Sequence, residues 1–98
     1  MEARMVAPEQ AIEFTWDDVI GGWLIKETDD WFVAVVPMIY NDRIILGTQE
    51  ERSYGYSYGW CFDKGGVAAM AAYVWNPDET LEPVGYKKQI GFRDGSGL

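Results

Sequence analysis

An aromatic ring stands at every second position of residues 54–62, which read YGYSYGWCF. Alternate residues of a β-strand point to the same face of a sheet, so this spacing predicts a row of rings on one face. Flat rings can stack on nucleobases, and they can also anchor a protein interface. The residues of this row are Tyr54, Tyr56, Tyr58, Trp60 and Phe62.

The net charge favours one of these two uses. The 98 residues include 16 acidic and 8 basic side chains, and the formal net charge of −8 repels phosphate backbones and anionic membranes. The stretch GYSYGWCF resembles the aromatic motif of RNA-recognition domains, but it lacks the basic residue that begins that motif. We therefore expect no direct contact with nucleic acid or membrane. The rings are expected to contact a partner protein, or a second copy of the chain in a homodimer.

A possible anion site lies at Lys64, Gly65 and Gly66, between a predicted strand and a predicted helix. Backbone amides at the start of a helix can bind an anion, and Lys64 would add positive charge. Neither the phosphate-loop pattern nor the dinucleotide fingerprint is present, and paired glycines commonly form a tight turn. The structural interpretation is favoured, and a small-ligand binder or enzyme at this site is the weakest alternative.

Pairs of adjacent carboxylates could bind a hard cation or act as acid and base. Adjacent residues of a strand point to opposite faces, and no calcium-loop spacing is present, so solvated turns explain the pairs better. An acidic surface could also imitate a nucleic-acid backbone, which makes an inhibitor of a host DNA- or RNA-binding enzyme the main alternative function. The acidic surface is expected at Asp17, Asp18, Asp29, Asp30, Glu50 and Glu51.

The chain contains no histidine, which removes the commonest general base and the commonest zinc ligand. Cys61 is its single cysteine, so no disulfide can form within the chain and no imidazole can activate the thiol. These observations predict a protein that is not an enzyme, with no catalytic residue, no metal and no cofactor.

The apolar pattern predicts an antiparallel β-meander of four to five strands. Residues 11–16 alternate like a half-buried strand, and the turn-forming residues of KETDDW, 26–31, predict a first hairpin. Asn41 and Asp42 are expected to form a two-residue type I′ turn in a second hairpin. The aromatic stretch 54–62 is expected to be a further strand, and residues 84–92 could add a short one.

A single helix is predicted after the aromatic strand, with Asp63 as its N-cap and with Asn76 and Pro77 as its end. Its apolar residues follow the spacing of a helix face, at Val67, Met70, Ala71 and Val74.

The helix is expected to cover one particular face of the aromatic strand. The residues that alternate with the rings along the strand have small side chains, and the helix is rich in alanine. The helix and this face of the strand are therefore expected to approach each other closely. This arrangement would leave the rings uncovered on the other face. The small residues are Gly55, Ser57, Gly59 and Cys61.

Together these elements predict an α+β fold, with one helix packed on one face of the antiparallel meander. The length predicts a single small globular domain over residues 1–98, in which 1–9 and 94–98 are loosely ordered. The N-terminus lacks a signal-peptide pattern, and the longest apolar run is too short for a membrane span. We expect a cytoplasmic protein.

The stretch YGWCFDKGGVAAMAAYVWNPDE gives the chain a resemblance to small uncharacterised accessory proteins of actinobacterial phages, over about residues 54–79. The shared features are an aromatic strand with Trp-Cys, a short turn, an alanine-rich helix and a Trp-Asn-Pro stop. The resemblance implies a protein that binds a host or phage protein, and it transfers no catalytic residue. The combined prediction is a non-enzymatic binding protein that uses the aromatic sheet face, with the acidic residues as a rim.

Overall fold

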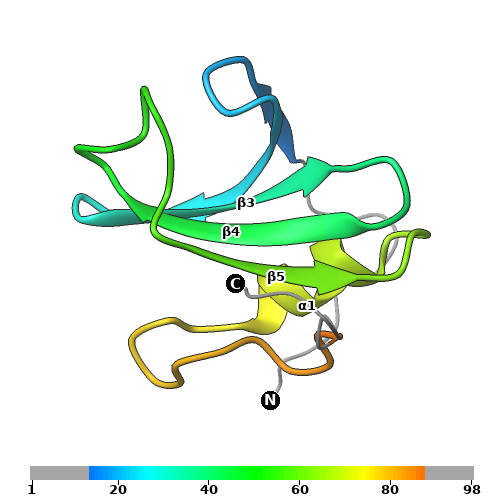
Figure 1. The fold of residues 1–98 in the computed structure, drawn as a ribbon. Coiled ribbons are helices and arrows are strands. Elements are labelled where there is room, and N and C mark those ends of the chain that lie inside the picture. The colour runs from blue at the N-terminus through cyan, green and yellow to red at the C-terminus, as the bar shows by residue number, and fades with distance from the viewer. Residues whose placement is uncertain (1–13, 88–98) are drawn as a thin grey trace, which may run out of the picture.

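The computed structural model describes residues 14–87, which form a five-stranded antiparallel sheet with one helix packed against it (Figure 1). The strands lie in chain order, so that each one pairs with the next along the sequence. This arrangement confirms the predicted α+β meander. The elements are β1 (Thr15–Asp17), β2 (Gly22–Glu27), β3 (Trp31–Pro37), β4 (Asp42–Thr48), β5 (Tyr58–Phe62) and α1 (Val67–Val74).

The first predicted hairpin is present, because β2 and β3 are joined through residues 28–30. The N–H of Thr28 donates to the carbonyl of Trp31 at 2.8 Å. The Thr28 hydroxyl accepts a hydrogen bond from the N–H of Asp30 at 3.1 Å. This local bonding of a threonine side chain to the backbone is what favours a turn at this position.

The second hairpin is also present, but its predicted type I′ turn is wrong. Asp42 is the first residue of β4 and lies opposite Pro37, so the chain reverses through residues 38–41. Within residues 14–87 only glycines have positive φ, which excludes the backbone that a type I′ turn needs at Asn41 and Asp42. The register that pairs Val35 with Ile44 places Asp42 inside the strand.

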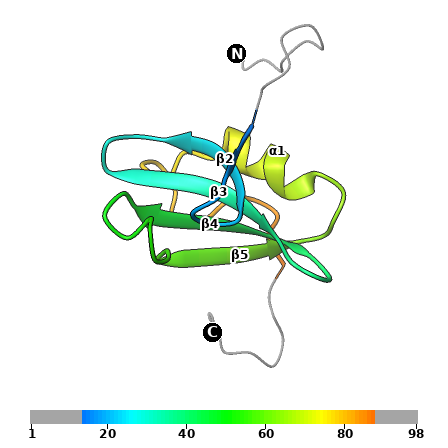
Figure 2. The same ribbon diagram turned by 90° about the horizontal axis from the view of Figure 1, so that it is seen from above.

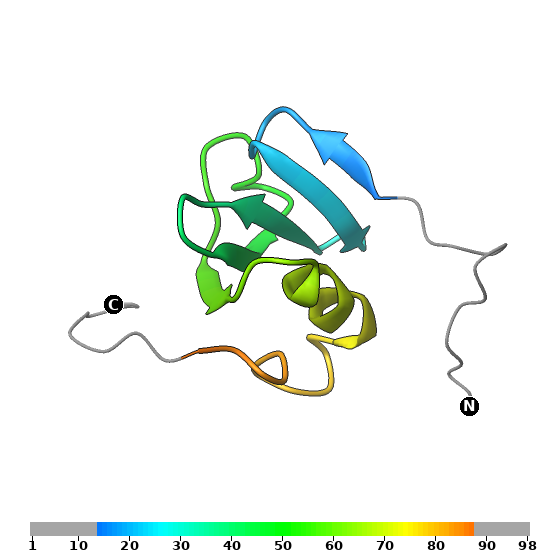
Figure 3. The same cartoon turned by 90° about the vertical axis from the view of Figure 1, so that its right-hand side faces the viewer.

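Both faces of the sheet are apolar, and α1 covers one of them (Figures 2 and 3). On the helix side, Val33, Val35, Ile44 and Phe62 form a buried cluster with Ala68, Ala72 and Trp75. The second cluster consists of Phe32, Ala34 and Ile45, with Ile20, Leu24 and Val36 packed against it. Since neighbouring residues of β3 belong to different clusters, the continuous apolar run of this strand reflects burial on both faces.

The aromatic strand is shorter than predicted. β5 begins at Tyr58, and residues 51–54 form a turn in which the carbonyl of Glu51 accepts hydrogen bonds from Tyr54 and Gly55. Tyr54 and Tyr56 therefore precede the strand. The five rings do not form one continuous row, because the regular alternation of a strand applies only from Tyr58 onward.

The predicted orientation of β5 is wrong. Trp60 and Phe62 pack against the buried cluster on the helix side, and the ring of Trp60 lies 5.1 Å from the ring of Trp75, edge to face. Residues of opposite parity, Gly59 and Cys61, therefore point to the other face. The physical reason is complementary packing, because Ala68 and Ala72 leave room for large rings beneath the helix.

The helix starts later than predicted and buries a different face. Its N-cap is Gly66, with φ of 90°, and Asp63 precedes the helix. The buried helical residues are Ala68 and Ala72. Three of the four residues of the predicted apolar face, Val67, Met70 and Val74, are exposed, and only Ala71 packs against the buried cluster.

The chain after α1 returns to the edge of β5. Asn76 and Pro77 follow Trp75, the C-cap of the helix, and the N–H of Lys87 donates to the carbonyl of Cys61 at 2.8 Å. This bridge falls within the predicted strand 84–92, of which residues 88–92 lie outside the described residues. The predictions for 1–9, 11–13 and 94–98 also fall outside them. Between residues 14 and 87, no helix is long and apolar enough to cross a membrane.

Candidate functional site

Three segments rich in carboxylates meet at one end of the sheet, on the left in Figure 1. The N–H of Gln49 donates to the carbonyl of Asp30 at 3.0 Å, which joins the β4–β5 loop to the β2–β3 turn. The indole N–H of Trp31 donates to Asp78 at 3.3 Å, which brings in the chain after α1. We call this region the acidic end; its carboxylates are Glu27, Asp29, Asp30, Glu50, Glu51, Asp78 and Glu79.

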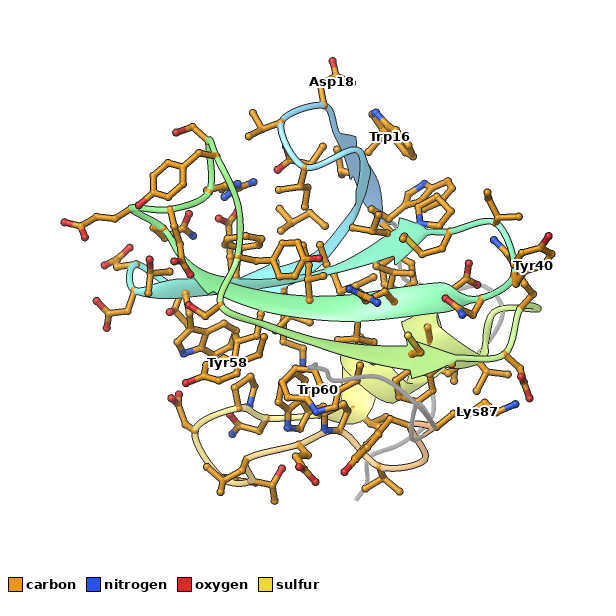
Figure 4. The ribbon with its side chains drawn as sticks, viewed as in Figure 1. Trp16, Asp18, Tyr40, Tyr58, Trp60 and Lys87 are labelled. Carbon is orange, nitrogen blue, oxygen red and sulfur yellow. The ribbon has the colours of Figure 1, made fainter. Side chains whose placement is uncertain are left out.

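The structure separates the predicted acidic pairs. Asp29, Asp30, Glu50 and Glu51 belong to the acidic end. Asp17 and Asp18 lie at the end of β1 and in the turn that follows, and Figure 4 shows Asp18 at the top of the molecule. The predicted acidic surface therefore covers two regions, which meet where Arg52 pairs with both Asp17 and Glu27.

Arg52 holds Asp17 in a structural network that sequence reasoning missed. Its guanidinium forms ion pairs with Asp17 and with Glu27, the latter at 2.6 Å, and also donates to Gln49 at 3.0 Å. It lies over the ring of Phe32, 5.4 Å from the ring centroid. This network fixes the β4–β5 loop across the face of the sheet opposite α1. Only the fold reveals it, because Arg52 is distant from Asp17 in the sequence.

The same contacts change the ionisation of two carboxylates. Burial alone would raise the pKa of Asp17, but hydrogen bonds from Arg52 and from the N–H of Val19 lower it below its ordinary value of 3.8. Hydrogen bonds from Gln49 and Arg52 lower the pKa of Glu27. Both groups are therefore stabilised as carboxylates in the folded chain.

Every basic side chain within residues 14–87 contacts a group of its own chain. Lys26 donates to the carbonyl of Tyr73 at 2.8 Å and to that of Trp75, at the end of α1. Lys87 pairs with Asp63 at 3.0 Å, and Arg52 is bound as described. Arg43 donates to the hydroxyl of Tyr56 at 3.4 Å. Within residues 14–87, these basic side chains form an ion pair with Glu27 but with none of the other carboxylates of the acidic end.

The predicted anion site is only partly assembled. Lys64 pairs with Asp42 at 3.0 Å, which already neutralises its charge. Gly65 and Gly66 have φ of 110° and 90°, a left-handed backbone that the turn before α1 requires. The helix begins without a side-chain cap. This geometry supports the structural interpretation of the two glycines.

The predicted ring row is divided between several environments. Tyr54 is 80% exposed in a turn, and Tyr58 is exposed beside Trp60, with the two rings stacked at 6.2 Å. Tyr56 lies on the other side of the sheet, near Arg43 and Gly59. A Cβ at Gly59 would lie 2.9 Å from Cδ of Arg43, so the small residues of β5 make room for these long side chains.

A concentration of exposed apolar side chains lies at the end of the sheet opposite the acidic end (Figure 4). Trp16 and Trp23 face each other across β1 and β2 with ring centroids 4.9 Å apart, and they are 47% and 41% exposed. Beside them is a groove of about 400 Å³ between the sheet and the start of α1. We call it the tryptophan groove; it is lined by Phe14, Trp23, Val35, Asp42, Gly66 and Ala69.

The β3–β4 loop extends the exposed apolar surface at the same end. Met38, Ile39 and Tyr40 are all exposed, Tyr40 by 88%, and we call these three residues the hairpin tip. Figure 4 shows Tyr40 at the far right, on the side of the molecule where Trp16 also lies. The tip leaves β3 at Pro37 and returns to β4 at Asp42, which itself lines the groove.

Sequence analysis did not identify this surface, because the groove combines residues from the chain before β1, from three strands and from the start of α1. One signal was available. Phe14 and Trp16 have the same parity, and Trp23 follows them across the glycine-containing turn. That pattern predicts three aromatic residues on one face of a hairpin.

The comparisons with known proteins add no relative: no family model, no curated protein and no solved structure matches this chain. Among the described residues, no group of three or more histidine, cysteine or acidic side chains is placed to hold a metal ion. The geometry of residues 14–87 is therefore the basis for assigning a function.

Proposed function

We propose that this chain is a non-enzymatic binding protein that contacts a partner protein through the tryptophan groove and the hairpin tip. The observation that supports the proposal is the gathering of large, exposed apolar side chains around a groove at one end of the sheet. Exposed apolar patches usually mark interaction sites, and tryptophan and tyrosine are the residues that most often anchor interfaces.

The contact surface proposed here differs from the aromatic sheet face expected from the sequence. Trp60 and Phe62 are used within their own chain, so they are not available to a partner. Trp16, Trp23 and Tyr40 replace them as candidate anchors. The acidic rim expected around the rings does not surround this surface, because the acidic end lies at the other end of the sheet.

Large apolar anchors contribute favourable free energy to an interface of this kind. Burial of one large apolar side chain contributes about 1.5–3 kcal/mol. Three such anchors, such as Trp16, Trp23 and Ile39, would together contribute about 4.5–9 kcal/mol before the cost of association is subtracted, so further contacts with the partner supply the rest of the affinity.

Site-specific photo-crosslinking tests this proposal. A photoreactive phenylalanine analogue is placed at Tyr40, at Trp16 or, as the control, at Leu81, which is 90% exposed but lies in the segment after α1. Because the chain resembles accessory proteins of actinobacterial phages, the crosslinking is carried out in cells of an actinobacterial host. We expect one shared protein adduct from positions 40 and 16, its loss with Trp23→Ala, and no such adduct from position 81. Equal crosslinking from all three positions would contradict the proposal.

A second candidate function is supported by the acidic end. Three segments bring their carboxylates together there, as an inhibitor that occupies a basic nucleic-acid-binding groove would require. The combined variant Asp29→Asn, Asp30→Asn and Glu50→Gln should then abolish binding to the target enzyme, whereas Trp23→Ala should not. The opposite pattern would favour the tryptophan groove. This comparison separates the two functions in one experiment.

A further inference from the structure

We infer that the tryptophan groove recognises a basic segment of the partner, in which an arginine or lysine lies next to a bulky apolar residue. This inference rests on the proposed function and adds the chemistry of the partner to it. It depends on three features of the groove: its aromatic walls, the one charged residue among the described residues that line it, and its size.

Asp42 is the charged residue among those that line the groove. Among the lining residues that the structure describes, the other side chains are apolar, so a ligand that enters meets the carboxylate of Asp42 beside apolar groups. Within residues 14–87, Asp42 accepts one side-chain hydrogen bond, from Lys64. Its side chain is 14% exposed, whereas that of Lys64 is 45% exposed and reaches it from the surface. The carboxylate can therefore accept a further hydrogen bond, or exchange Lys64 for the planar guanidinium of a partner arginine.

The aromatic walls favour the same kind of ligand. Phe14 and Trp23 line the groove, and Trp16 contacts Trp23 edge to face. The stems of arginine and lysine are apolar and pack against aromatic rings, and their cationic groups are attracted to ring faces. A cationic side chain can therefore satisfy Asp42 while its stem contacts Phe14 and Trp23.

The size of the groove calls for more than one side chain. Its volume of about 400 Å³ is within the range of small-ligand pockets and exceeds the needs of one lysine or arginine. A neighbouring apolar residue can occupy the remaining space near Val35 and Ala69. Since the chain carries a net charge of −8, a basic segment also suits the molecule as a whole better than a second copy of this acidic chain.

Three labelled nonapeptides with the same leucine residues on both sides of a central position test this inference. The central residue is arginine, glutamine or glutamate, and fluorescence anisotropy measures binding to the full chain. We expect the arginine peptide to bind about tenfold more tightly than the glutamine peptide and the glutamate peptide to bind most weakly. Equal affinity of the arginine and glutamine peptides, or no binding by any peptide, would overturn the inference.

Matched charge variants then locate the interaction. Asp42→Asn and Asp29→Asn remove the same charge, but Asp29 is exposed in the β2–β3 turn. Asp42→Asn should weaken the arginine peptide by about tenfold and leave the glutamine peptide unchanged, whereas Asp29→Asn should weaken the arginine peptide much less. An equal loss in both variants would overturn the inference by showing attraction to net charge alone.

A blocking variant covers the case in which Asp42→Asn fails to fold. Ala69→Arg places a guanidinium of the chain itself beside the groove and should abolish binding of the arginine peptide. Unchanged binding would overturn the inference.

Sedimentation of the chain without peptide tests whether a second copy occupies the groove. A dimer that dissociates in the Trp23→Ala variant would also overturn the inference. In either case, crosslinks from positions 16 and 40 to another protein would still support the proposed function.

Discussion

Gly47 shows how one missing side chain organises the face of the sheet opposite α1. A Cβ at this position would lie 2.8 Å from Cε1 of Phe32 and 3.0 Å from the Cα of Tyr56. The ring of Phe32 is fully buried, and the backbone at Tyr56 belongs to the loop that crosses this face. The glycine therefore allows a core ring and a loop to approach the same strand.

The first prediction follows from these distances. Gly47→Ala should lower the free energy of unfolding by about 1–3 kcal/mol, because the added methyl group forces the buried ring or the loop to move. Gly55→Ala is the matched control, since a Cβ at Gly55 would meet nothing within 4 Å. Urea unfolding measures both variants. Equal stability of the two would show that the loop adapts without cost.

A second residue-scale prediction concerns Arg52 and pH. The pKa values of Asp17 and Glu27 are lowered in the folded chain from ordinary values of 3.8 and 4.5. The stability that they contribute is therefore present above about pH 4.5 and is lost as the pH falls through their lowered folded values. Arg52→Met should reduce the free energy of unfolding at pH 7 by about 1–2 kcal/mol, and by much less at about pH 2, where the carboxylates are protonated.

Urea unfolding at the two pH values checks this prediction. Lys87→Met is the control, because its ion pair with Asp63 is exposed on both sides, with 60% and 72% of the two side chains accessible. Its effect should stay within about 0.5 kcal/mol at either pH. A loss in Arg52→Met that did not depend on pH would indicate that packing over Phe32, and not the ion pairs, is the main contribution of Arg52.

At the scale of elements, α1 depends on the sheet for its stability. It has eight residues and no side-chain N-cap, and isolated helices of this length are not stable in water. Two contacts with the sheet compensate. Ala68 and Ala72 are buried against it, and Lys26 of β2 donates to the carbonyls of Tyr73 and Trp75 at the C-terminal end. A cation near the last carbonyls also suits the helix dipole.

The third prediction tests the contact of Lys26. Burial lowers the pKa of this lysine, but its hydrogen bonds satisfy carbonyls that the end of the helix leaves without partners. Lys26→Met keeps most of the stem and removes the donor, and it should cost about 1–3 kcal/mol. Hydrogen exchange should show that Lys26→Met accelerates amide exchange in α1 more than in β3, relative to the unmodified protein. If Lys64→Met, which removes a surface lysine, were equally destabilising, the capping role would be contradicted.

The fourth prediction tests which face of α1 is buried. Ala72→Leu adds three carbon atoms beneath the helix, where Trp75 and Phe62 already pack, and should cost about 1–3 kcal/mol. Val74→Leu enlarges a side chain that is exposed and should change stability by less than about 0.5 kcal/mol. Thermal unfolding followed by circular dichroism compares the two. A larger loss in Val74→Leu would contradict the observed orientation of the helix.

The elements also show what the sequence can and cannot predict. Periodicity located the hairpins and the helix, because local alternation and turn chemistry determine them. It did not determine which parity of β5 faces α1, since either small or large residues can oppose alanine. In the structure the aromatic residues of β5 face α1, because Trp60 and Phe62 fill the space that Ala68 and Ala72 leave. The groove was missed because its residues come from distant segments, which only the register brings together.

At the scale of the whole molecule, charge and apolar surface are separated. The segments of the acidic end meet at the left of Figure 1, and Figure 4 shows Tyr40 of the hairpin tip at the right of the molecule. The tryptophan groove is lined by Trp23, Val35 and Asp42, at the same end of the sheet as the tip. Within residues 14–87, each lysine and arginine side chain forms a hydrogen bond or an ion pair with another group of the chain. For a basic partner, the acidic end would provide long-range attraction, and the tryptophan groove would provide the short-range contacts.

The last prediction follows from this division of roles. The association rate of the arginine-centred nonapeptide should fall about three- to tenfold when the salt concentration rises, because salt screens the field of the acidic end. The dissociation rate should change less, since apolar contacts are not screened and the Asp42 carboxylate, with 14% of its side chain exposed, is screened less than surface charges. The variant Asp29→Asn, Asp30→Asn and Glu50→Gln should lower only the association rate, and Trp23→Ala should raise only the dissociation rate. Stopped-flow fluorescence measures both, and a single variant that changed both rates equally would show that the two ends act as one surface.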